Sequence, residues 1–194
     1  MSESLRDVPL AELTVDDGVR PKAPEFDDVS DAQRAGGRHL AAIHRHYLMD
    51  MARILTVLRR IRAGDAPPEA LQHIVLAADM TQNLRAFGTL CGQECRALTM
   101  HHDIEQTSIF PQLEHAGNDA LRAVVARLRA EHHVVHELLE RLAAASHALV
   151  HEPTEAQLEE TSQIFEQLET VVRSHFRYEE TELAEALGVL GVLI

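Results

Sequence analysis

Tryptophan is absent from this chain of 194 residues, and glycine and proline are scarce, with 9 and 7 residues. A shortage of the residues that form turns and interrupt helices favours long helices. Basic residues are also few: Lys22 is the single lysine, and 31 acidic residues against 18 basic ones give a formal net charge of −13. This balance argues against a nucleic-acid partner and against an anionic membrane, because both attract basic surfaces.

Cysteine is limited to two residues, Cys91 and Cys95, which are four positions apart. Such a pair on one helix does not readily form a disulfide, so we interpret both as packing residues, with a redox-active thiol near a metal as the alternative. The chain has no run of apolar residues long enough to span a membrane, and its first 20 residues do not resemble a secretory signal. We therefore expect a cytoplasmic location.

Histidine is the residue in excess, with 13 copies. An imidazole can bind a metal ion, transfer protons or sense pH in the physiological range. The length and an apolar content of 45% predict one globular domain, or two at most. The position of the histidines along that domain then decides which role is favoured.

Apolar residues recur every three or four positions in four long segments, which predicts amphipathic helices over residues 31–63, 69–109, 118–150 and 154–187. Gly64, Pro111 and Gly117 mark the ends of the first two, and Pro153 precedes the last. The predicted fold is all-α, an up-down-up-down four-helix bundle over residues 30–187. Residues 1–29 form an acidic arm, and the apolar tail 188–194 packs on its own domain or joins a dimer interface.

Metal-competent side chains interrupt the apolar stripe of every predicted helix. Three of the helices carry a pair spaced i,i+4, which places both members on one face with their Cβ atoms about 5–6 Å apart. The set is His44, His101, Glu105, His132, His136, His175 and Glu179. Buried imidazoles and carboxylates without partners are costly, and metal ions satisfy both. The set exceeds the needs of one tetrahedral zinc, so we predict two metal ions with a bridging carboxylate.

Neighbouring residues compete with this assignment. His102 lies on the same apolar arc as His101 and is i,i+3 from Glu105, but we favour His101 because the i,i+4 spacing recurs in the other pairs. Glu94, two turns earlier, is either an acid that supports a ligand or a surface residue. Tyr47 either packs in the core or points its phenol toward the site.

The remaining histidines are predicted to lie away from the site. His133 is off the apolar stripe of its helix. The others are assigned to the surface or rim of the bundle: His39, His46, His73, His115, His147 and His151.

The order of these motifs resembles the hemerythrin family, in particular the hemerythrin-like HHE cation-binding domains. The matching segments, within residues 35–187, are LAAIHRHYLMDM, HHDIEQTSIFP, AEHHVVHELL and HFRYEE. The resemblance implies a hemerythrin-like four-helix bundle that holds two non-heme iron ions as a diiron centre. Glu105 and Glu179 would be the bridging carboxylates and the five histidines the terminal ligands, with an oxo or hydroxo bridge left open.

One departure from the family pattern bears on function. Oxygen-carrying hemerythrins end with His-x4-Asp, whereas this chain has Glu179 at the x3 position and Glu180 at the x4 position after His175. On a helix Glu179 shares the face of His175 and Glu180 turns away, so we assign Glu179 as the ligand. Gln106 also stands where many of these domains have a second glutamate. The different final ligand disfavours simple reversible oxygen carriage.

The resemblance thus implies a diiron protein that binds or reacts with a small oxidant: O2, H2O2 or NO. Two alternatives stay open at this point. One is an enzyme that decomposes peroxide in the manner of a catalase or peroxidase, or that handles NO; the other is an iron store or a sensor of iron or oxygen. The expected partner is a small molecule, with no nucleic acid and no membrane, and the expected state is a monomer or homodimer.

Overall fold

The computed structural model of the chain describes residues 5–65, 93–151 and 154–192. Its helices are α1 (Arg34–Arg62), α4 (Gln93–Ile104), α5 (Phe110–Ala116), α6 (Asp119–His151) and α7 (Glu155–Val189). A π-helical turn, Glu105–Ile109, joins α4 to α5. Three short 3-10 turns precede α1, over Leu5–Asp7, Leu10–Glu12 and Asp17–Val19.

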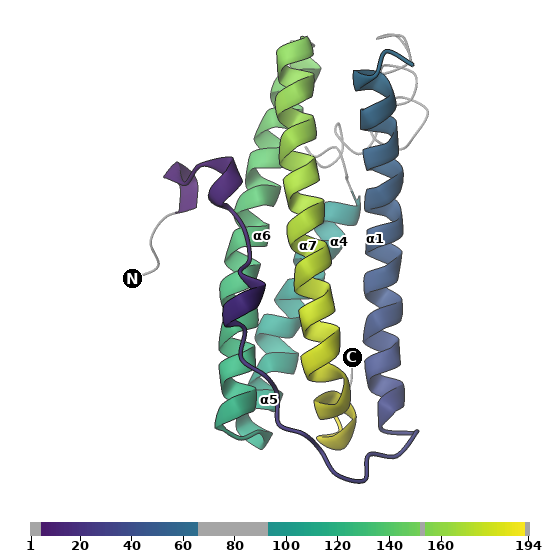
Figure 1. The fold of residues 1–194 in the computed structure, drawn as a ribbon, viewed down its shortest axis with the longest axis vertical. Coiled ribbons are helices and arrows are strands. Elements are labelled where there is room, and N and C mark those ends of the chain that lie inside the picture. The colour runs from purple at the N-terminus through teal and green to yellow at the C-terminus, as the bar shows by residue number, and fades with distance from the viewer. Residues whose placement is uncertain (1–4, 66–92, 152–153, 193–194) are drawn as a thin grey trace.

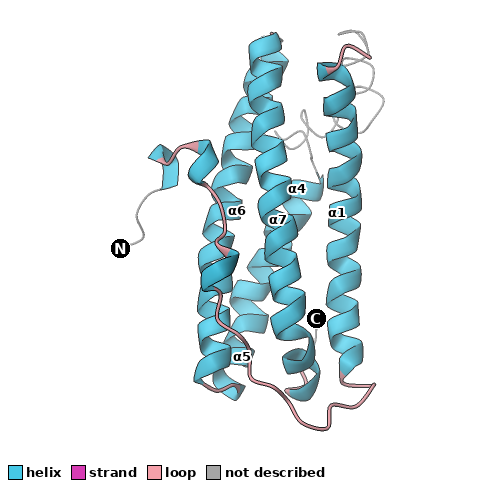
Figure 2. Ribbon diagram, viewed as in Figure 1, coloured by secondary structure: helices cyan, strands magenta, loops and turns pink. Residues whose placement is uncertain are grey.

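The helices run alternately up and down the long axis of the molecule, as predicted (Figure 1). α1 and α6 ascend, α4 with α5 descends, and α7 descends between α1 and α6. The described part of the chain contains helices, turns and loops but no strand (Figure 2). Residues 69–92 of the predicted helix 69–109 lie outside the described residues. None of the described helices is long and apolar enough to cross a membrane.

Local signals in the sequence account for the helix ends. Ser30 and Gln33 form a reciprocal capping box ahead of α1: the Gln33 amide donates to Ser30 Oγ at 3.3 Å, and the Ser30 amide donates to Gln33 Oε1 at 2.8 Å. Gly64 ends the helix with a φ of 72°, a conformation that favours glycine. Asn118 and Thr154 accept backbone N–H groups at the starts of α6 and α7.

Pro111 does not end the second predicted helix, which is a correction to the sequence prediction. The helix continues to Ala116, and Gly117 is its true end. The π-helical turn explains the difference. It places Pro111 in the first turn of α5, where a missing N–H and a fixed φ are tolerated. A proline inside an unbroken α-helix would have removed a hydrogen bond and kinked it.

The apolar stripes meet in two separate core clusters. One lies toward the upper end in Figure 1 and contains Leu58, Leu142 and Phe165; the other lies toward the lower end and contains Phe110, Leu121 and Leu183. On α1 and on the segment from α4 to α5 the predicted ligand positions fall between residues of the two clusters in the sequence, and on α6 and α7 they fall where residues of one cluster give way to those of the other. The site is therefore placed midway along the bundle, with packed apolar layers above and below it.

The N-terminal arm lies along α6 and α7 before it crosses to the start of α1 (Figure 1). Leu13 is 1% exposed and belongs to the upper cluster. At the other terminus Val192 packs into the lower cluster of its own chain. The division at residues 29 and 188 stays a prediction.

Candidate metal centre

A first group of ligands joins four helical segments of the bundle. It contains His44 from α1, His101 from α4, Glu105 from the π-helical turn and Glu179 from α7. One potential ligand atom from each lies within 4.8 Å of the others, and all four side chains are buried. The Nε2 atoms of the two histidines face each other at 3.1 Å. Four helix segments with independent sequence signals thus bring their polar residues to one point.

A second group lies beside the first and contains three imidazoles. It consists of His102 from α4, His132 from α6 and His175 from α7, again with one ligand atom from each within 4.8 Å. His102 and His132 stack with their ring centroids 3.9 Å apart. His136, a predicted ligand, is half-buried and stands one step outside, with its Nε2 3.3 Å from His102 Nδ1. Of the predicted set, the structure therefore brings six residues into the two groups and adds His102.

Each carboxylate of the first group also lies close to a histidine of the second group. Glu105 approaches His101 Nε2 with Oε1 at 3.0 Å and His132 Nε2 with Oε2 at 3.4 Å. Glu179 Oε2 lies 3.5 Å from His44 Nε2 and 3.8 Å from His175 Nε2. A carboxylate in such a position can bind one ion with each oxygen, or both ions with one.

Many polar atoms that face this centre lack a hydrogen-bond partner among the described residues. They are His102 Nε2, both ring nitrogens of His132, His175 Nε2, both oxygens of Glu105 and Glu179 Oε2. The histidine and glutamate atoms at the short distances given above do not have hydrogen-bonding geometry. Buried groups of this kind are normally satisfied, because leaving one unpaired costs about 1–3 kcal/mol. Nitrogen and oxygen donors that converge in two adjacent groups fit two transition-metal ions.

The electrostatics of the centre also favour cations. Burial raises the pKa of Glu105 to about 7, and burial together with the neighbouring Glu105 charge raises the pKa of Glu179 to about 8. Burial lowers the pKa of His101, His102 and His132. The imidazoles are thus kept neutral, as metal ligands must be, while the carboxylates gain from any cation placed between them.

Carboxylates outside the two groups hold two of the ligand histidines. Glu180 Oε1 lies 3.0 Å from His44 Nδ1, and Glu131 Oε2 lies 3.2 Å from His175 Nδ1. Each carboxylate can accept the Nδ1 proton, which leaves the Nε2 lone pair directed at the centre. Glu180 was predicted from helical geometry to point away from His175, and it instead contacts His44 of α1.

Sequence reasoning missed Glu131, although a signal was present. Glu131 lies three residues after Leu128 and four before Val135, and both are fully buried. A carboxylate at a buried position of an amphipathic helix is costly unless a hydrogen-bond donor or a positive charge is paired with it. Burial alone would raise the pKa of Glu131, but hydrogen bonds from His175 and Arg20 outweigh it and lower the pKa to about 2.

Aromatic rings enclose the centre. Phe176 stacks on His44 with ring centroids 3.8 Å apart, and Phe110 lies 5.4 Å from His132. Tyr47 is half-buried with its ring 5.7 Å from that of His101, so it lies beside the site. These rings form an apolar wall that limits access of water to the ligands.

The remaining sequence assignments fall at the surface or outside the described residues. His39, His46, His115, His133 and His147 are exposed. Cys91 and His73 lie outside the described residues, and so do the side chains of Glu94, Cys95 and His151, so their assignments stay predictions.

Comparison with known proteins supports the same type of site. The family model for the hemerythrin HHE cation-binding domain matches residues 38–187, which include both ligand groups. No curated protein and no solved structure matches the chain. The match covers well over half of the chain, so we conclude that the protein belongs to the hemerythrin HHE cation-binding domain family.

Proposed function

We propose that the two ligand groups hold two non-heme iron ions and that the protein binds or reacts with O2, H2O2 or NO at this diiron centre. The observation that carries the proposal is the position of Glu105 and Glu179, each between an imidazole of the first group and one of the second. Two separate mononuclear sites would not need carboxylates shared in this way. The unpartnered buried atoms support the presence of resident cations.

The chain's residues have distinct tasks in this proposal. His44 and His101 would hold the first ion, and His102, His132 and His175 would hold the second. Glu105 and Glu179 would neutralise the charge of both ions and are close enough to both groups to be shared between them. Iron held there would supply reversible electron transfer to or from the small oxidant. The apolar layers around the centre exclude water and so protect a reactive bound molecule.

His136 has a supporting task in this proposal. Its Nε2 lies 3.3 Å from His102 Nδ1, so it can hold the His102 ring while His102 Nε2 faces the centre. This assigns the ligand position to His102 and treats His136 as the residue that fixes its orientation. Direct ligation by His136, as predicted from the sequence, is the competing assignment.

The test is anaerobic loading of the full chain with Fe²⁺, followed by metal analysis. We expect about two irons per chain, and an optical spectrum that changes on exposure to O2, peroxide or NO. The variant His44→Ala should lose iron, whereas His39→Ala, an exposed histidine of the same helix, is the matched control. A single tightly held zinc, or no iron retained, would refute the diiron assignment.

The same samples separate the reactions. A spectrum that reverses when O2 is removed indicates a carrier. Rapid O2 evolution from peroxide that is lost in Glu105→Gln indicates a peroxide-decomposing enzyme. Iron binding with neither response indicates storage or sensing, and would contradict the proposed reactivity while leaving the metal centre intact.

A further inference from the structure

The side chain of Arg20, in the N-terminal arm, is buried although it is charged, and it contacts helices that are far from it in sequence. Its side chain is 7% exposed. It binds Glu131 with two parallel hydrogen bonds, Nε to Oε1 at 2.8 Å and Nη2 to Oε2 at 2.9 Å. Its Nη1 also donates to Ser174 Oγ at 3.0 Å, and its guanidinium lies 4.6 Å from the ring centre of Tyr178. Bidentate pairs of this kind are strong and fix orientation.

The Glu131 carboxylate connects Arg20 to the metal centre. Its Oε2, which accepts from Arg20, also lies 3.2 Å from His175 Nδ1, and Glu131 itself is 2% exposed. Arg127 of α6 donates to the other oxygen at 2.8 Å. Two arginines thus hold the carboxylate that orients a ligand of the second group. Without Arg20 the carboxylate would keep one arginine, whose side chain is 25% exposed, and would be free to turn from His175.

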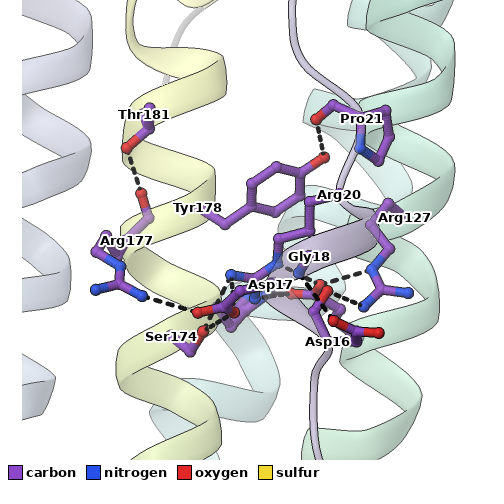
Figure 3. A network of polar contacts seen from close by, with 12 residues as sticks. Asp16, Asp17, Gly18, Arg20, Pro21, Arg127, Ser174, Arg177, Tyr178 and Thr181 are labelled. Carbon is purple, nitrogen blue, oxygen red and sulfur yellow. Dashed lines mark hydrogen bonds and ion pairs between the residues drawn. The ribbon is translucent and has the colours of Figure 1, made fainter.

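Further contacts fix this part of the arm on α6 and α7 (Figure 3). Asp17 pairs with Arg177 at 2.9 Å and accepts from Ser174 at 2.6 Å. Arg127 donates to the Asp16 carbonyl at 3.0 Å. The Tyr178 hydroxyl donates to the carbonyl of Pro21 at 2.7 Å. The position of the Arg20 guanidinium is therefore set by the docked arm as a whole.

We propose that Arg20 is a positioning residue of the metal centre and that docking of the arm increases retention of the metal ion in the second ligand group. This inference rests on the proposed diiron centre. Arg20 acts through Glu131, which keeps the Nδ1 proton of His175 engaged and its Nε2 directed at the ion. Residues that hold a metal ligand in this way affect metal affinity by about 10–100-fold. Arg20 lies outside residues 38–187, so the family match does not include it.

The test follows release of Fe²⁺ from the anaerobically loaded full chain into an excess of a chelator. Arg20→Ala should release one of its two irons about tenfold faster than the unsubstituted chain, with the other unchanged. Arg20→Lys, which keeps the charge but not the paired hydrogen bonds, should recover part of the loss.

The matched control is Arg141→Ala. Arg141 also holds the arm, through the carbonyls of Leu5 and Arg6, but it pairs with Glu137 and does not contact Glu131. Arg20→Ala should lower the stability of the metal-free chain more than Arg141→Ala, because its pair with Glu131 is the more deeply buried, and it alone should speed the release of one iron while the other is retained as before. Equal release from both variants would show a merely structural effect and overturn the inference.

A second measurement on the unsubstituted chain does not depend on any variant folding. Coupling between two sites is reciprocal, so metal binding must stabilise the docked arm if the docked arm retains metal. Hydrogen exchange at residues 16–23 should therefore slow when Fe²⁺ is bound. Unchanged exchange in a chain that holds two irons would overturn this inference alone. A chain that holds fewer than two would overturn the proposed function as well.

Discussion

His44 and His175 have corresponding places in the two ligand groups, and each presents Nδ1 to a carboxylate outside its group. Their carboxylates differ. Glu180, beside His44, is 35% exposed, whereas Glu131, beside His175, is buried and bound by Arg20 and Arg127. The first group also has two imidazoles and both carboxylates, and the second has three imidazoles. The difference indicates that the metal centre has two unequal halves. The first ligand group is the more adaptable half, the second group is the more firmly held half, and Glu105 and Glu179 lie close to both.

The largest effect should come from substitution of Glu105, which we propose as a bridging carboxylate. Glu105→Gln removes the charge that both halves share, so we expect both irons to bind more than about 100-fold more weakly, beyond the loss caused by residues that only support a ligand. Metal analysis after dialysis measures it. The metal-free variant should be more stable than the parent at pH 8, because it no longer buries this carboxylate. Retention of two irons would show that Glu105 does not bridge.

The next effect distinguishes His102 from His136 in the second half. His102→Ala should leave about one iron per chain, whereas His136→Ala should keep two and release one about tenfold faster. Iron content and release kinetics of the two variants, measured together, decide the assignment. The reverse result would restore His136 as the direct ligand, as the sequence spacing predicted.

A smaller effect tests the asymmetry between the outer carboxylates. Glu131→Gln disrupts a buried group held by two arginines, whereas Glu180→Gln alters a partly exposed one. We expect Glu131→Gln to weaken iron retention by about 10–100-fold and Glu180→Gln by about tenfold or less. Competition with a chelator gives both values. Equal losses would remove the distinction between the two halves.

The smallest effect concerns the pH dependence of the metal-free protein. Burial raises the pKa of Glu105 and Glu179 from 4.5 to about 7 and about 8, so their contribution to stability is lost as pH rises toward 8. Burial lowers the pKa of His101, His102 and His132 below 6.5, so theirs is lost as pH falls through 6.5.

The metal-free chain should therefore be most stable between about pH 6 and 7, and about 1 kcal/mol less stable at pH 8. Thermal unfolding followed by circular dichroism across this range measures the effect, with the iron-loaded chain as control. Stability that rises steadily from pH 6 to pH 8 would contradict the assignment of buried, protonated carboxylates.

The sequence predicted the fold because the apolar stripes have the helical period over many turns. The helices at 34–62, 119–151 and 155–189 lie close to their predicted ranges. Six of the seven ligand candidates chosen from the sequence come together in the two groups, because the members of an i,i+4 pair share a face of their helix. The choice between His102 and His136 could not be made in this way. A helical wheel gives directions around one axis, and the distance between α4 and α6 depends on their docking.

The partners of the ligands were harder to predict. Arg20 and Glu131 are 111 residues apart, and no local spacing connects them. Glu180 was placed correctly relative to His175 but its contact with His44 lies across the α1–α7 interface. Long-range pairs of this kind follow from the packing of whole helices.

The π-helical turn at Glu105–Ile109 contains one extra residue, which changes the directions in which the following side chains point relative to the preceding ones. Its wider turn lets the Phe110 N–H reach the Glu105 carbonyl five residues earlier, so Phe110 lies one turn beyond Glu105 and beside His132. In a regular α-helix the residue four positions on, Ile109, would take that place. The extra residue in this turn thus places an aromatic ring next to the metal centre and leaves the i,i+4 spacing of His101 and Glu105 unchanged.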